Sequence, residues 1–303
     1  MTALPLLHAA AQIGWTQWTV HWSTVIGLVL LAGLYEWAAR RAGAGFRVPG
    51  AGEAHAEADR GRSPGTPHPA PGTPSRAQRI SFYAGILTIF LSLNGPLHDL
   101  SDYYLFSAHM LQHLLLTLLL PPLLIWGTPG AMLRPALQLK GVGPVARWLT
   151  KPVHCFVLFN LVLSAWHLPP LYNTALAHHP VHIVQHLMFM VTAVLMWWPL
   201  MSPLPELPRL AYPAQMLYCF VMVIPMSIVS IYIAMADRIL YPLYATAPRL
   251  WGLSPMMDQM LGGLIMWIPG GLFFYGVMTV VFFKWAQRQE DSTAAAQVGW
   301  APR

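Results

Sequence analysis

The chain has 303 residues, of which 56% are hydrophobic and only 9% are charged, against roughly 25% charged residues in soluble domains. This composition argues against a water-soluble globule and indicates an integral membrane protein. The formal net charge of +6 is explained by basic loops on one side of a bilayer, so it gives no support for a nucleic-acid partner.

Seven apolar segments are long enough, or nearly so, to cross a hydrocarbon core of about 30 Å as helices. They lie at about residues 20–38, 79–95, 104–127, 152–168, 181–201, 211–235 and 258–285. Several contain proline, which membrane helices tolerate because neighbouring groups satisfy the freed backbone atoms. We therefore predict an all-α, polytopic membrane helix bundle of about seven transmembrane helices.

Four parts follow from this assignment. Residues 1–41 hold an N-terminal outer segment and the first transmembrane helix, and residues 42–78 form a disordered cytoplasmic loop rich in Pro, Gly and Ala. Residues 79–285 form a six-helix membrane core, and residues 286–303 a cytoplasmic tail. The loop also carries His55 and His68, which we interpret as solvated side chains.

The distribution of basic residues predicts the orientation. Of the 17 Lys and Arg residues, only Arg238 and Arg249 fall in connections on one side of the predicted bundle. The other 15 lie on the side that holds the long loop and the C-terminus. Because basic residues stay in the cytoplasm, the N-terminus is expected outside and the C-terminus in the cytoplasm.

A short motif, H-x-x-Q-H, occurs twice. Residues 108–114 read AHMLQHL and residues 181–187 read VHIVQHL, so the histidines are His109 and His113 in one copy and His182 and His186 in the other. His98 precedes the first copy as His167 precedes the second. The last hairpin is a weak third match. These similarities predict internally repeated helical hairpins.

The predicted topology gives the two motifs similar depths. The third and fifth helices both run inward from the outer side, and residues four apart share one face of a helix. Each motif therefore presents two imidazoles as a stripe along one face of its helix. Ionisable groups inside membranes are costly and mark functional sites, and neutral imidazoles suit copper or zinc. The candidate metal ligands are His109, His113, His182, His186, His98 and His167.

Two further residues are candidates either to bind the metal as accessory ligands or to hold a ligating imidazole in place. Met110 lies within the first motif, and thioether sulfur favours Cu(I) over zinc, although most of the 16 methionines are expected to pack or face lipid. Asp258 lies at the outer end of the last helix, where it could orient an imidazole, bind the metal or interact with the helix dipole. For Asp99 and Asp102 we favour helix capping.

Several segments together resemble the CtaG family of caa3-type cytochrome c oxidase assembly factors. They are LNGPLHDLS at 93–101, SAHMLQH at 107–113, PPLLIWGTP at 121–129, WHLPPLY at 166–172, VHIVQH at 181–186 and DQMLGG at 258–263. The resemblance spans roughly residues 80–285. It implies a non-enzymatic protein of the bacterial cytoplasmic (inner) membrane that helps to build a haem-copper oxidase by supplying copper. Oxidase subunits and other copper chaperones would be its partners, alongside the lipid bilayer.

Three functions stay open at this point. The first is a copper-binding assembly factor that holds Cu(I) between the third and fifth helices by the four motif histidines, with His98 and His167 as mouth or exchange ligands. The second is a membrane haem protein that uses one histidine of each motif as an axial ligand and transfers electrons. The third is a copper or proton transporter, for which the cytoplasmic halves of the helices offer few polar groups. Zinc is an alternative metal.

Overall fold

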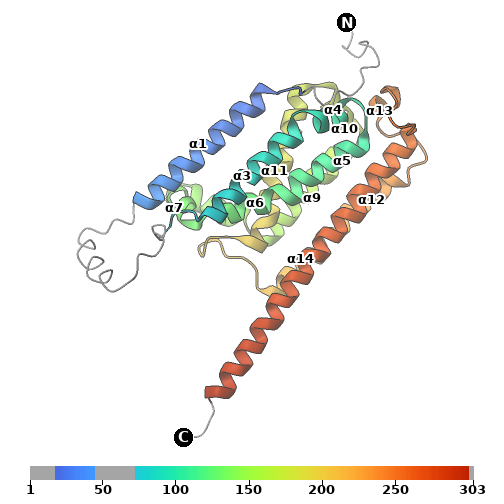
Figure 1. Cartoon of the computed structure of the whole chain (residues 1–303). Helices are drawn as coiled ribbons and strands as arrows, with labels where there is room; N and C mark the ends of the chain where they lie inside the picture. Colours follow the sequence, from blue (N-terminus) through green and yellow to red (C-terminus); the bar gives the residue numbers. More distant parts are fainter. Residues whose placement is uncertain (1–17, 45–71, 300–303) are drawn as a thin grey trace.

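Long helices that run side by side make up the protein, and short helices join them at both ends (Figure 1). The structure is a computed structural model that describes residues 18–44 and 72–299, and it contains no strand within these ranges. The elements are α1 (Trp22–Ala44), α3 (Arg76–Leu93), α4 (Pro96–Tyr103), α5 (Phe106–Leu114), η3 (Leu115–Leu119), α6 (Leu120–Gly127), α7 (Gly130–Leu137), α8 (Val142–Leu149), α9 (Pro152–His167), α10 (Pro169–Ala177), α11 (His179–Met201), α12 (Tyr212–Ala234), α13 (Pro242–Thr246) and α14 (Pro255–Gly299).

Five stretches within the described residues are long and apolar enough to cross a membrane alone. They are α1, the continuous run α5–η3–α6, α11, α12 and α14. Two bent helix pairs, α3 with α4 (45°) and α8 with α9 (74°), raise the number to seven if each pair is one span. Each of the seven predicted segments coincides with one of these, which confirms an all-helical protein with five to seven candidate membrane-spanning helices. The internal repeat of hairpins stays a prediction. The orientation stays a prediction.

Several helix boundaries differ from the sequence prediction; α1, for example, continues to Ala44 rather than ending at residue 38. Two of the differences have a local reason. Helix α3 begins at Arg76 because Ser75 and Gln78 form a capping box, in which each side chain bonds the backbone N–H of the other. Helix α14 continues to Gly299, through most of the predicted tail, because no Gly or Pro interrupts residues 286–298. The predicted outer segment up to residue 17 and most of the predicted loop lie outside the described residues.

The helix that carries the first motif is not a regular α-helix. Residues 115–119, which begin two residues after His113, form a π-helical stretch, and such stretches are frequent at functional sites. Pro121 has no N–H to donate to the carbonyl of Thr117, four residues earlier. The indole N–H of Trp197 on α11 donates to that carbonyl instead, at 3.0 Å. A side chain of α11 thus stabilises the irregular segment.

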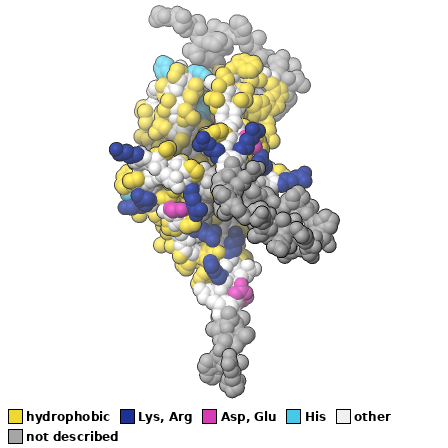
Figure 2. All heavy atoms as spheres, turned by 90° about the vertical axis from the view of Figure 1, so that its left-hand side faces the viewer, with side chains coloured by type: hydrophobic (Ala, Val, Ile, Leu, Met, Phe, Trp, Pro, Cys, Tyr) yellow, Lys and Arg dark blue, Asp and Glu magenta, His cyan; other side chains and the backbone are white. Residues whose placement is uncertain are grey.

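The two ends of the bundle differ in chemistry. The short helices α4, α10 and α13 gather at the upper end, next to the start of α5 (Figure 1). On the face drawn in Figure 2, histidines gather at that end, whereas Lys and Arg lie around the middle and lower part. Basic side chains and histidines are thus separated along the bundle.

Candidate metal centre

All six predicted histidines lie inside the bundle. They come from α4, α5, α9 and α11, and each is 5% exposed or less. Burial of so many imidazoles is costly unless the rings find partners. The six are His98, His109, His113, His167, His182 and His186.

The two motif stripes face each other across the interface of α5 and α11. The ring of His109 lies 5.5 Å from that of His182 and 5.9 Å from that of His186, measured between centroids. His113 lies 5.5 Å from His186 and 5.7 Å from His167. The structure therefore brings together four motif histidines and His167 in one cluster.

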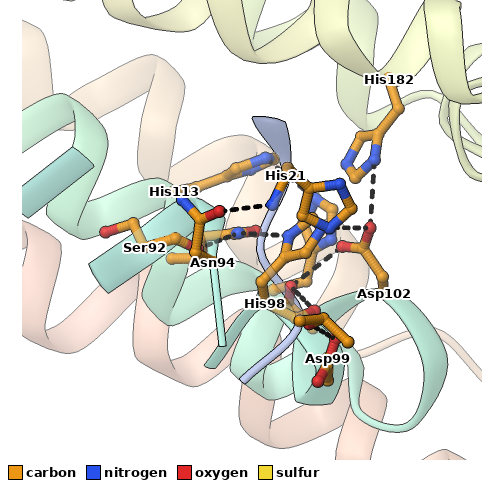
Figure 3. Close-up of polar contacts among 12 residues, drawn as sticks. His21, Ser92, Asn94, His98, Asp99, Asp102, His113 and His182 are labelled. Atoms are coloured by element: carbon orange, nitrogen blue, oxygen red, sulfur yellow. Dashed lines mark hydrogen bonds and ion pairs between the residues drawn. The ribbon is translucent and has the colours of Figure 1, made fainter. Parts of the chain in front are cut away.

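Asp102 is part of this cluster, although the sequence favoured a capping role for it. Its Oδ2 atom lies 3.3 Å from Nδ1 of His182 and 3.4 Å from Nε2 of His98, and Figure 3 shows the three side chains converging. A carboxylate oxygen of Asp102 and ring nitrogens of His109 and His182 all lie within 4.8 Å of one another. Nitrogen and oxygen ligands about 2.0–2.1 Å from a tetrahedral ion are about 3.3 Å apart, so the three groups would have to draw together by up to about 1.5 Å to share one ion.

A signal for Asp102 was present in the sequence. His98 and Asp102 are four residues apart, the same spacing that places the two histidines of each motif on one face. Asp99, the neighbouring acid, faces elsewhere and accepts a hydrogen bond from the hydroxyl of Thr19 at 2.6 Å. Only Asp102 of this pair therefore joins the histidines.

Two of the imidazoles have the hydrogen-bond arrangement of metal ligands. His167 donates from Nδ1 to the carbonyl of Leu163 at 2.6 Å, and Nδ1 of His182 faces the Asp102 carboxylate. Since both acceptors require a proton on Nδ1, Nε2 carries the lone pair in each ring. Both Nε2 atoms are buried without a hydrogen-bond partner among the described residues. Ligating histidines are oriented in this way by carbonyls and carboxylates.

The remaining motif rings also have unused nitrogens. Nε2 of His109 and Nε2 of His113 are only 2.9 Å apart, and Nδ1 of His113 has no hydrogen-bond partner. Neither ring nitrogen of His186 has a partner within the described part of the chain. Buried polar atoms are almost always paired, so this group of unpaired lone pairs points to a ligand.

The predicted accessory residues hold α5 in position. The carboxylate of Asp258 on α14 accepts hydrogen bonds from the backbone N–H groups of Phe106 and Ser107 at 2.7 and 3.1 Å. It thereby caps the start of α5 from another helix, because Leu105 at the N-cap provides no side-chain acceptor. Met110 is fully buried in the apolar cluster that also contains Phe106. Packing accounts for its position.

Apolar side chains pack against the histidine cluster next to His113 and His167. The ring of Phe189 lies 4.5 Å from that of His113 and 5.9 Å from that of His167. Phe189 belongs to the largest buried apolar cluster of α9, α11, α12 and α14. On the side of the short helices, Tyr244 donates to the carbonyl of Ser101 at 2.6 Å and lies 3.1 Å from the hydroxyl of Tyr172.

The family model for the cytochrome c oxidase caa3 assembly factor matches residues 62–288 of this chain. The chain belongs to this family. The match begins before α3 and ends within α14, so it contains Asp102 and all six histidines of the cluster but not α1. The resemblance inferred from the sequence motifs is confirmed.

Curated relatives of this assembly-factor family member occur in mycobacteria. Uncharacterised proteins of Mycobacterium bovis and Mycobacterium tuberculosis are each 28% identical to it, and one of Mycobacterium leprae is 26% identical. Each alignment covers 209 residues, which is 64% of this chain but 32% of the relative. The chain thus spans about a third of the length of these relatives. No solved structure matches it.

Proposed function

We propose that this protein binds a cuprous ion at the cluster of Asp102 and the six histidines and supplies it to a haem-copper oxidase during assembly. The observation that carries the proposal is the group of buried imidazole nitrogens without hydrogen-bond partners, which converge from four helices. Oxidase subunits and copper chaperones of the bacterial cytoplasmic membrane are the partners that this function requires.

The charge of the cluster supports Cu(I). The imidazoles that could bind are neutral as ligands, and Asp102 is the carboxylate among them. One monovalent cation beside one carboxylate has no net charge, whereas Zn²⁺ would leave a positive charge in the low-dielectric interior. Since packing explains the sulfur of Met110, this balance of charge is a better argument for Cu(I) than the thioether.

The number of donors supports transfer to another protein. A closed structural site uses about four ligands, whereas this cluster contains six imidazoles and a carboxylate. Surplus donors allow an ion to exchange one ligand at a time, so that it can leave without passing through a bare state. Delivery needs this property and permanent storage does not.

The surroundings of the cluster give less support to the two alternatives. A transporter needs polar groups along its whole path. Here the ring of Phe189 packs against His113 and His167, and Phe189 belongs to a large cluster of buried apolar side chains. A haem needs room for the whole porphyrin around its axial ligands, but the ring of His109 packs against Tyr172 at 5.2 Å and that of His113 against Phe189 at 4.5 Å between centroids, so side chains occupy the surrounding space.

Copper binding is tested with His113→Ala and His186→Ala, and with His178→Ala as a control at an exposed histidine. Purified proteins are loaded with Cu(I) without oxygen, and copper per chain is measured by elemental analysis. We expect both cluster variants to lose bound copper and the control to retain it. Retention of wild-type copper in both cluster variants refutes this site, and a Soret band in the purified protein supports haem instead.

Supply to the oxidase is tested in cells that lack the chain. We expect their haem-copper oxidase to contain less copper and to be less active, and the wild-type chain to restore both. His186→Ala should accumulate in the membrane without restoring either. Normal oxidase copper in cells without the chain contradicts the supply function, whatever the purified protein binds.

A further inference from the structure

Beside the buried cluster lies a cavity of about 430 Å³ between α1, α3 and α11. Its walls are mostly apolar, yet five histidines line it: His21, His98, His179, His182 and His186. His98, His182 and His186 belong to the proposed copper site. His21 and His179 do not, and His21 lies outside the residues that match the family model.

His21 and His179 are close to each other at one end of this cavity. Their ring centroids are 5.8 Å apart, and the ring of His21 is 4.5 Å from that of His98. His179 is exposed and His21 is half-buried. Among the described residues, neither ring forms a hydrogen bond, so all four nitrogens are available to an ion from outside the bundle.

His21 is held in this place by contacts between residues 18–21 and the bend between α3 and α4. The backbone N–H of His21 donates to Oδ1 of Asn94 at 2.8 Å (Figure 3), and the carbonyl of Thr19 accepts from the N–H of Gly95 at 3.0 Å. Gly95 has a φ of 69°, which favours glycine, and a Cβ there would lie 2.5 Å from the ring of Trp18. The segment before α1 is thus fitted to the α3–α4 bend.

We propose that His21 and His179 form an acceptance site, where a cuprous ion first binds before it reaches the buried cluster through the cavity. This inference rests on the proposed function. Neighbouring rings form a continuous series: His21 to His98 at 4.5 Å, His98 to His182 at 6.4 Å, and His182 to His186 at 4.4 Å. Each step replaces one imidazole nitrogen on Cu(I) by another, and no electron is transferred.

The ligand count gives this route a direction. The acceptance site offers two neutral imidazoles, whereas the buried site offers several imidazoles and the Asp102 carboxylate. An ion therefore binds more tightly inside. Loss of the acceptance site should slow loading without changing where the ion finally binds.

The rate of loading tests the route. Half an equivalent of Cu(I), held by the colorimetric chelator bicinchoninate, is mixed with purified protein, and loss of the chelate colour is followed by stopped flow. For the double variant His21→Ala with His179→Ala we expect loading to be slower by about tenfold or more, with the same final copper content. His178→Ala, which changes the exposed histidine next to His179, should load at the wild-type rate.

A second pair of variants tests the cavity without removing a histidine. Gly27 lines the cavity, and a Cβ there has no atom within 4 Å, so Gly27→Leu should narrow the cavity and slow loading. Gly33 has equal space and lies outside the cavity lining, so Gly33→Leu should have no effect.

The outcomes separate this inference from the proposed function. Wild-type loading rates in both the double variant and Gly27→Leu refute the route and leave the copper site intact. Loss of final copper content in the double variant shows that His21 and His179 are ligands of the main site, which also refutes an acceptance role. A wild-type protein that takes no copper from the chelator refutes the proposed function and the route together.

Discussion

Asp102 and His182 come from different helices, and Oδ2 of the carboxylate lies 3.3 Å from Nδ1 of the imidazole. The contact joins α4 to α11 at the point where the histidines of both motifs converge. It also fixes the proton of His182 on Nδ1, which leaves Nε2 as the electron-pair donor. A carboxylate in this place both orients a ligand and offsets the charge of a bound cation.

Replacement of Asp102 by asparagine should weaken copper binding. Asp102→Asn keeps the shape of the side chain but removes its charge, so we expect the affinity for Cu(I) to fall by about 10- to 100-fold. Competition with a chelator of known affinity measures the change. The control is Asp99→Asn, since Asp99 bonds Thr19 and should not affect binding. Equal affinities in the two variants would show that Asp102 has no part in the site.

Asp258 should contribute to stability more than to copper binding. Asp258→Ala removes the acceptor for two N–H groups at the start of α5, and loss of a helix cap costs about 0.5–2 kcal/mol. We expect a lower Tm, with the copper content of the folded protein unchanged. Asp237→Ala, at an exposed acid in the connection between α12 and α13, should leave the Tm unchanged. A variant of Asp258 that keeps its Tm and loses its copper would instead identify it as a ligand.

Much of the fold was predictable because its signals are local. Apolar length identifies each crossing segment without knowledge of its neighbours, and the i, i+4 spacing of His109 and His113 fixes a shared face. The matching pair on α11 and the upstream histidines then suggested one cluster. In the structure the rings of both motifs lie together with that of His167. His98 and His167 are buried, whereas the sequence placed them at the mouth of the site.

Other features depend on contacts between distant residues and had no comparable signal. The capping of α5 by Asp258 spans about 150 residues of sequence. The donation from Trp197 to Thr117 depends on the position of α11 beside η3. The role of Asp102 was predictable only in part. Its spacing from His98 is visible in the sequence, but its contact with His182 depends on the angle between α3 and α4.

Met110 offers a test of the packing interpretation. Met110→Leu removes the sulfur and nearly preserves the volume, and such exchanges cost less than about 1.5 kcal/mol. Because Met110 belongs to the apolar cluster with Phe106, we expect wild-type copper content and affinity. Met266→Leu, in the same cluster on α14, is the matched control. A loss of Cu(I) affinity in Met110→Leu alone would make the thioether a ligand.

The bond between Trp197 and Thr117 should stabilise the π-helical stretch. Trp197→Phe keeps an aromatic ring but removes the donor to a buried carbonyl that Pro121 cannot satisfy, and an unpaired buried acceptor costs about 1–3 kcal/mol. Trp198→Phe removes a similar bond, to the carbonyl of Leu207 at 3.3 Å, in a less buried position. We therefore expect a larger fall in Tm for Trp197→Phe, measured in the same detergent. Since η3 begins two residues after His113, Trp197→Phe should also weaken Cu(I) binding. Equal Cu(I) affinities in the two variants would show that the π-helical stretch does not affect the site.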